Sequence, residues 1–158
     1  MNFKIEVFKK TGVFDSAGEG VKKDIADLNI KSVEKVITSE IYIISGRITD
    51  GDIEKIGREL LIDPVVQDFR FKRISSYNLA GDENTCANRT IEVGFKLGVT
   101  DAVAETVQKG VKDMGIDGVD FIRTVKKFAL VGNISKEEIN LIKRRLLVND
   151  IINESVIY

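Results

Sequence analysis

Residues 91–101 read IEVGFKLGVTD, and residues 5–15 read IEVFKKTGVFD. The two stretches begin with the same three residues and end on the same Gly-Val-x-Asp pattern. When the chain is compared with itself at an offset of about 86 residues, positions 4–72 align with 90–158 without a gap. Roughly 21 of the 69 paired positions are identical, more than similar composition produces by chance. The sequence therefore predicts an internal duplication.

The duplication sets the domain boundaries that we expect. Residues 1–72 should form one module (repeat 1) and residues 90–158 a second (repeat 2). Between them, residues 73–89 read RISSYNLAGDENTCANR, a polar stretch with the Gly/Asn content of a connector.

Each repeat starts with a strand and a helix. The phrase FKIEVF alternates apolar and polar residues, as a half-buried strand does. Asp15 and Asp101 then stand at the N-cap position, each before an apolar stripe at helical spacing. Gly115 is placed to end the helix of repeat 2. The stripes comprise Ala17, Val21, Ile25 and Leu28 in repeat 1, and Val103, Val107, Val111 and Met114 in repeat 2.

A long β-branched run follows in each repeat. Residues 33–46 read VEKVITSEIYIISG and residues 119–132 read VDFIRTVKKFALVG. Each run is long enough for two strands, so we expect a turn near 38–40 and near 124–126, although neither place offers a glycine or proline.

The second helix of each repeat begins with a capping box. TDGD at 49–52 and SKEE at 135–138 place Thr49 and Ser135 at the N-cap, with a carboxylate three residues on. The segments DPVVQDFRF and NDIINESVIY then return to strand. The order in each repeat is βαββαβ. The predicted fold class is α+β, with two tandem ferredoxin-like modules whose antiparallel sheets are each covered on one face by helices.

Composition excludes several classes of function. The 24 basic and 25 acidic residues are scattered, so we expect no nucleic-acid partner. No apolar run approaches the roughly 20 residues needed to span a bilayer, so we expect no membrane partner. The single cysteine, Cys86, allows no intrachain disulfide, which favours the cytoplasm. The absence of histidine removes Ser-His and Cys-His pairs and histidine metal ligands.

Few residues suggest chemistry of their own. Neither GxxxxGK[ST] nor a complete GxGxxG occurs, so no cofactor site is predicted. Asp15 and Asp101 could be paired carboxylates, but helix capping explains both more simply. We therefore expect no catalytic, cofactor-binding or metal-binding residue in this chain.

The order of these motifs resembles the PurS family. The matching segments are GVFDSAGEGVKKDI with LLIDPVVQDF in repeat 1, and GVTDAVAETVQKGV with IRTVKK and LLVNDIINE in repeat 2. The family usually has proline after the motif aspartate, where Ser16 and Ala102 stand here, and an Arg-x-Gly-Lys turn that survives only as Arg123 and Lys126 around Val125. A tandem pair of this kind is similar to the N-terminal region of fused synthetases.

The resemblance implies a function for the chain. PurS is the small accessory component of phosphoribosylformylglycinamidine (FGAM) synthase, an ATP- and glutamine-dependent ligase of purine biosynthesis. The chain is then expected to be a non-catalytic adaptor. It would bridge PurL-type synthetase and PurQ-type glutaminase components and support ammonia transfer, while ATP and magnesium bind the synthetase. Further self-association stays open.

The basic group Arg123, Lys126 and Lys127 is the candidate partner contact. On the predicted hairpin it would lie at the tip, where side chains protrude and meet partners. A solvated turn is the alternative interpretation of the same residues.

Three further questions stay open at this stage. A tandem ACT-like module that binds an amino acid is the alternative function, because Gly12 and Gly98 provide a glycine turn after the first strand. An acylphosphatase-like hydrolase needs an arginine there, and residues 8–14 and 94–100 contain none. The end of the last predicted strand at Tyr158 suggests a piece of a longer synthetase, with a stand-alone subunit as the alternative.

Overall fold

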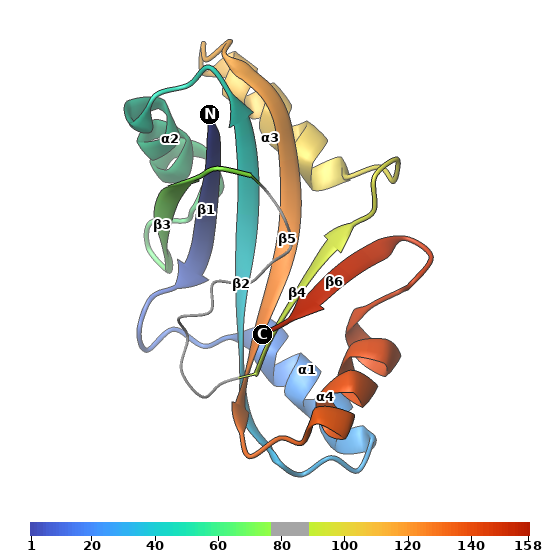
Figure 1. Ribbon diagram of the computed structural model, residues 1–158. Helices are drawn as coiled ribbons and strands as arrows, with labels where there is room; N and C mark the ends of the chain where they lie inside the picture. Colours follow the sequence, from blue (N-terminus) through green and yellow to red (C-terminus); the bar gives the residue numbers. More distant parts are fainter. Residues whose placement is uncertain (77–88) are drawn as a thin grey trace. The chain divides into compact units, whose positions relative to one another are not determined.

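The computed structural model describes residues 1–76 and 89–158, so most of the predicted connector, with Cys86, lies outside the described residues (Figure 1). Both repeats contain strands and helices in the same order. In repeat 1 these are β1 (Asn2–Lys9), α1 (Ser16–Asp27), β2 (Val33–Gly46), α2 (Asp50–Ile56), the π-helical turn η1 (Gly57–Leu61) and β3 (Gln67–Ile74). In repeat 2 they are β4 (Arg89–Phe95), α3 (Ala102–Asp113), β5 (Val119–Gly132), α4 (Lys136–Ile142), the π-helical turn η2 (Lys143–Leu147) and β6 (Asn153–Ile157).

The strands β2 and β5 are each one continuous strand of 14 residues. The prediction of a turn near 38–40 and 124–126 is therefore wrong. β1 pairs antiparallel with only one half of β2, from Phe8 opposite Ser39 to Asn2 opposite Ser45. Because β-branched residues favour extended backbone and no glycine or proline interrupts the run, the chain passes straight on where a hairpin was expected.

The chain divides into two compact units, and each unit takes segments from both repeats. Unit 1 comprises Met1–Val13, the described part of Ser39–Asn78, and Gly98–Val125. Unit 2 comprises Phe14–Thr38, the described part of Leu79–Leu97, and Lys126–Tyr158. The segments Phe14–Thr38 and Gly98–Val125, called the exchanged segments below, each lie in the unit formed mainly by the other repeat.

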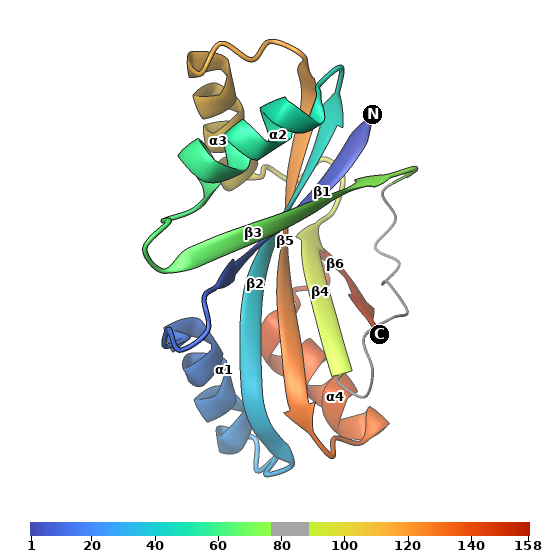
Figure 2. The ribbon, with the colours of Figure 1, turned by 90° about the vertical axis from the view of Figure 1, so that its left-hand side faces the viewer.

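Unit 1 is a four-stranded sheet with two helices. Its strand order is β3-β1-β2-β5, with β1 antiparallel to both β2 and β3. Its helices are α2, from repeat 1, and α3, from repeat 2, and α3 contacts η1, which continues α2 (Figures 1 and 2). Their apolar faces share one core with the sheet, which contains Phe3, Ile5, Val7, Tyr42, Ile44, Ile48, Ile53, Ile56, Ala104, Val107, Val111, Ile116 and Ile122.

Unit 2 repeats this plan with the roles of the repeats reversed. Its strand order is β2-β5-β4-β6, with β4 antiparallel to β6, and its helices are α4 from repeat 2 and α1 from repeat 1 (Figure 2). Its core contains Ile25, Ile30, Val33, Val36, Ile91, Val93, Leu130, Ile134, Ile139 and Ile142. The fold is α+β with two ferredoxin-like modules, as the sequence predicts.

Glycines permit the close approach of the exchanged segments to their hosts. Gly46 ends β2 with φ of 156°, and a Cβ built on it would lie 2.1 Å from the Gly118 carbonyl oxygen. Gly132 ends β5 with φ of 141°, and its Cβ would lie 2.0 Å from the Ser32 carbonyl oxygen. Any side chain at either place would collide with backbone of the other repeat.

Candidate functional site

The basic group predicted as a partner contact lies in the middle of β5. Arg123, Lys126 and Lys127 fall on an uninterrupted strand, so they do not form the tip of a hairpin. Arg123 is only 9% exposed, Lys127 is half-buried and Lys126 is exposed. Of the three, Lys126 is therefore the side chain most accessible to a partner.

Strand geometry separates these three side chains onto two faces. Successive residues of a strand point to opposite faces of the sheet. Ile122 and Leu130 belong to the two helix-covered cores, so Lys126 shares their face of the strand. Arg123 and Lys127 point to the opposite face. The structure therefore places Arg123 and Lys127 on one face of β5 and Lys126 on the other.

The aspartates predicted as N-caps each reach beyond their own helix. Asp15 accepts a hydrogen bond from the Gly18 backbone N–H at 2.9 Å, and also from the Thr38 N–H and hydroxyl, both at 2.8 Å. Asp101 accepts from the Ala104 N–H at 2.9 Å and from the Thr124 N–H and hydroxyl, both at 2.8 Å. Each carboxylate thus ties a helix start to the midpoint of a long strand.

Tyr42 places a polar hydroxyl group in the core of unit 1. This residue was not singled out from the sequence. Its hydroxyl donates to Glu40 Oε2 at 2.9 Å. Burial raises the pKa of Tyr42 well above its usual range, and the negative charges of Glu40 and Asp101 raise it further. The phenol therefore stays protonated and acts as a hydrogen-bond donor. The Glu-x-Tyr spacing, which puts both side chains on one face of a strand, is the signal that could have found the pair.

Two equivalent acidic residues are buried on the other face of the sheet. In unit 1, Glu6 accepts from the Ser39 hydroxyl at 2.9 Å and from two nitrogens of Arg70, at 2.9 and 2.6 Å. In unit 2, Glu92 is 1% exposed and accepts from the Tyr158 hydroxyl. Buried carboxylates are satisfied by such partners, so both have a structural explanation.

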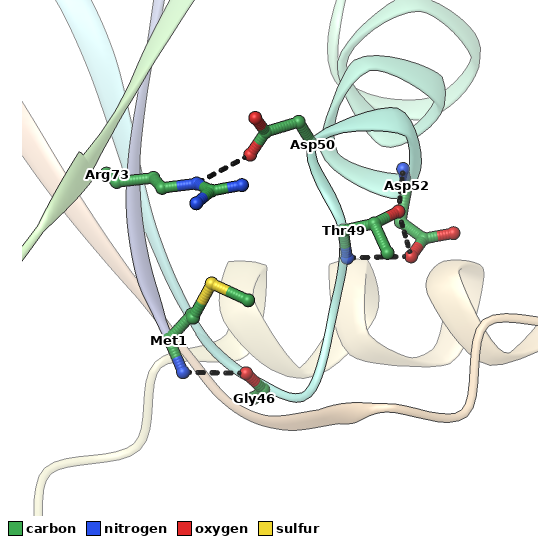
Figure 3. Close-up of polar contacts among 6 residues, drawn as sticks. All are labelled: Met1, Gly46, Thr49, Asp50, Asp52 and Arg73. Atoms are coloured by element: carbon green, nitrogen blue, oxygen red, sulfur yellow. Dashed lines mark hydrogen bonds and ion pairs between the residues drawn. The ribbon is translucent and has the colours of Figure 1, made fainter.

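The two capping boxes form as the residue pattern indicates. Thr49 accepts from the Asp52 N–H, and the Asp52 carboxylate accepts from the Thr49 N–H at 2.9 Å (Figure 3). Ser135 and Glu138 make the same reciprocal pair. Hydrogen bonds from backbone N–H groups lower the pKa of Asp52 and of Glu138. Glu138 also accepts from the Ser32 hydroxyl at 2.8 Å, a bond between the two repeats within unit 2.

Unit 1 also gathers several chain segments at one end of α2. The N-terminal ammonium of Met1 donates to the Gly46 carbonyl at 2.9 Å, and Arg73 of β3 pairs with Asp50 at 2.8 Å (Figure 3). Because Arg73 and Asp50 are both more than half exposed, this ion pair contributes little to stability.

The hydrogen bonds and ion pairs described above join groups of the chain itself. Over residues 1–76 and 89–158, no group of three or more Cys, Asp and Glu side chains has a metal-binding arrangement. No helix in the same part of the chain is both long and apolar enough to cross a bilayer. The polar clusters described above cap helices, join strands or satisfy buried acids.

Comparison with protein-family models matches the chain to PurS, described as phosphoribosylformylglycinamidine (FGAM) synthase, over residues 2–75 and again over residues 88–157. No curated protein matches the chain. The two matched ranges correspond to the two repeats and together cover nearly all of the sequence. The chain belongs to the PurS family, as a tandem pair of PurS repeats with a role in FGAM synthase and purine biosynthesis.

Proposed function

We propose that the chain is a non-catalytic adaptor of FGAM synthase that bridges a PurL-type synthetase and a PurQ-type glutaminase and supports the transfer of ammonia between them. The observation that carries this proposal is the double match to the PurS family over almost the whole chain. On this proposal ATP and magnesium bind the synthetase, and glutamine is hydrolysed by the glutaminase.

The residue inventory supports a binding role over a catalytic one. The chain has no histidine, so it cannot form a Ser-His or Cys-His nucleophile pair. The carboxylates that could act as acids or bases, Asp15, Asp101 and Glu6, accept hydrogen bonds from backbone or side-chain donors of the fold. Such hydrogen bonds give these carboxylates a structural role in the fold.

Lys126 is the proposed contact residue. Lys126 is exposed on β5, and a lysine side chain presents a compact positive charge that an acidic partner surface can pair with. The equivalent position of repeat 1 is Glu40, at the same place in β2. The two repeats therefore present opposite charges at equivalent places, which would let a partner distinguish them.

The test is reconstitution from separate components. The chain, a PurL-type synthetase and a PurQ-type glutaminase are mixed with formylglycinamide ribonucleotide, ATP, magnesium and glutamine, and FGAM is measured. We expect glutamine-dependent synthesis only when all three proteins are present. Ammonia in place of glutamine should support the synthetase with less dependence on the chain. Failure of the three proteins to associate at micromolar concentration would reject the adaptor role.

A charge reversal localises the contact. Lys126→Glu should weaken association and glutamine-dependent activity by about tenfold, the loss of one well-placed charge contact. Because glutamate occurs naturally at the equivalent position in β2, the fold should tolerate it. Lys109→Glu, an equal charge change at an exposed position of α3, is the matched control and should leave association unchanged. Equal effects of both variants would show that general charge, not this site, governs binding.

A further inference from the structure

The exchanged segments place each repeat against residues of the other, and these residues differ between the two copies. We propose that the repeats have diverged into mutually specific partners, so that repeat 1 pairs with repeat 2 in preference to a second copy of itself. The interaction surface is the contact of each exchanged segment with its host core, and the partner that it fits is the opposite repeat.

The first determinant lies between α3 and η1 in unit 1, which are in contact. A Cβ on Gly110 would lie 2.7 Å from Cδ1 of Leu60, so α3 approaches this leucine as closely as a glycine allows. The residue of repeat 1 equivalent to Gly110 is Asp24, which is exposed in unit 2. If α1 took the place of α3, as pairing of repeat 1 with itself requires, the Asp24 side chain would meet the end of the Leu60 side chain. Leu60 would then have to move out of its packed position, which disfavours this pairing.

The second determinant lies in unit 2. Ser32 of repeat 1 donates its hydroxyl to Glu138 of repeat 2 at 2.8 Å. The residue of repeat 2 equivalent to Ser32 is Gly118, which has no hydroxyl. Pairing of repeat 2 with itself would therefore lose this charge-assisted hydrogen bond. The contact of Leu60 with Gly110 thus disfavours the pairing of repeat 1 with itself. The hydrogen bond of Ser32 to Glu138 disfavours the pairing of repeat 2 with itself.

The charges of the helices also favour pairing of repeat 1 with repeat 2. In unit 2, α1 has three acidic and two basic residues and contacts η2. The α4–η2 segment, Lys136–Leu147, has four basic and two acidic residues. The corresponding α2–η1 segment, Asp50–Leu61, has four acidic and two basic residues. Pairing of repeat 1 with itself would place the acidic α1 beside the acidic segment, whereas pairing with repeat 2 places it beside the basic one.

The test uses the folded full-length chain with a protease site inserted between residues 76 and 89. After cleavage the two halves are unfolded in urea, refolded together, and weighed as intact complexes by native mass spectrometry. Random pairing would leave about half of all complexes heterotypic. We expect heterotypic complexes to exceed either homotypic species by about tenfold or more, as for a specific pair. A distribution matching random pairing would overturn the proposal.

Variants identify the determinants. Gly110→Asp should reduce the heterotypic share, whereas Thr106→Asp, the same charge change at an exposed position of the same helix, should not. Asp24→Gly should raise the share of repeat 1 paired with itself. If Gly110→Asp and Thr106→Asp behave alike, the Leu60 contact is not a determinant and the proposal fails for unit 1.

A measurement on the uncut chain tests the second determinant even where the cleaved halves do not refold. Ser32→Ala should lower Tm in the wild-type background and leave it unchanged in Glu138→Ala, because the two side chains act through one hydrogen bond. A purely local capping role for Glu138 predicts additive losses, and additivity would overturn this part of the proposal.

Discussion

The Asp15 carboxylate accepts hydrogen bonds from both the backbone N–H and the hydroxyl of Thr38, 23 residues further along the chain. This bond joins the first turn of α1 to the middle of β2, where the strand leaves one unit and enters the other. Asp101 and Thr124 repeat the relationship 86 residues later. Each exchanged segment is thereby held as one body, with its helix fixed to its own half-strand.

Asp15→Ala should destabilise unit 2 and Asp101→Ala unit 1. Each removes an N-cap and leaves the N–H of Thr38 or Thr124 without its acceptor, which together should lower the free energy of unfolding by about 2–3 kcal/mol. Hydrogen exchange should show the loss of protection first in α1 for Asp15→Ala and first in α3 for Asp101→Ala. Asparagine at either position keeps one acceptor oxygen and should lose about half as much. Equal losses for Ala and Asn would mean that the one acceptor oxygen kept by asparagine contributes nothing by itself.

Gly46→Ala should be among the most damaging single-methyl additions in the chain. The new Cβ would meet the Gly118 carbonyl oxygen at 2.1 Å, and the φ of 156° is unfavourable for alanine. We expect a loss of more than about 2 kcal/mol in urea unfolding, because backbone must move. Gly20→Ala is the control. Its Cβ would have no atom within 4 Å, and the helix α1 should gain roughly 0.5–1 kcal/mol.

Acidification should lower the stability of the protein, because it protonates the carboxylates of the two capping boxes. The pKa values of Asp52 and Glu138 lie below their ordinary values of 3.8 and 4.5, because backbone N–H groups hydrogen-bond the charged forms. The stabilisation is therefore complete above the unfolded-state pKa values and is lost as the pH falls through the folded-state values. Asp52→Asn and Glu138→Gln should each flatten the slope of Tm against pH below about pH 5. An unchanged slope in both variants would show that other carboxyl groups dominate acid unfolding.

At alkaline pH the relevant group is Tyr42. Its pKa is raised in the folded state, so the stabilisation from its neutral form is present below the unfolded pKa of about 10 and is lost as the pH rises further. Tyr42→Phe should reduce the alkaline loss of stability. At neutral pH it should lower the free energy of unfolding by no more than about 1 kcal/mol, because Glu40 is exposed and can be solvated. Absorbance at 295 nm should show Tyr42 ionising only with unfolding.

Much of the fold could be predicted from single residues. Asp15, Asp101, Thr49 and Ser135 stand where four helices begin, because a side-chain oxygen ahead of an amphipathic stripe satisfies the free N–H groups of a first turn. Gly115 follows α3 with φ of 77°, the conformation for which glycine was expected there. These features depend only on neighbours within a few positions in the chain.

The exchange of segments could not be predicted in this way. Whether residues 38–40 turn or continue is decided by the strands that lie alongside, and β2 lies between β1 of its own repeat and β5 of the other. A hairpin and a straight strand place Val36 and Tyr42 on the same face, so hydrophobic pattern does not discriminate between them. Only the lack of glycine or proline at the midpoint indicated the straight course. The same ambiguity misplaced Arg123, which is buried within a strand and not at a tip.

The interleaved cores bear on how such a gene can change. A recombination event that removed either copy would leave an unfinished globule missing a helix and half a strand, so the tandem form resists reversion to a single copy. Which substitutions are tolerated at Leu60 depends on Gly110, about 50 positions away in the other copy. Substitutions at Ser32 depend in the same way on Glu138, 106 positions away. The two copies are thus expected to evolve together, because a substitution in one copy limits which substitutions the other can accept.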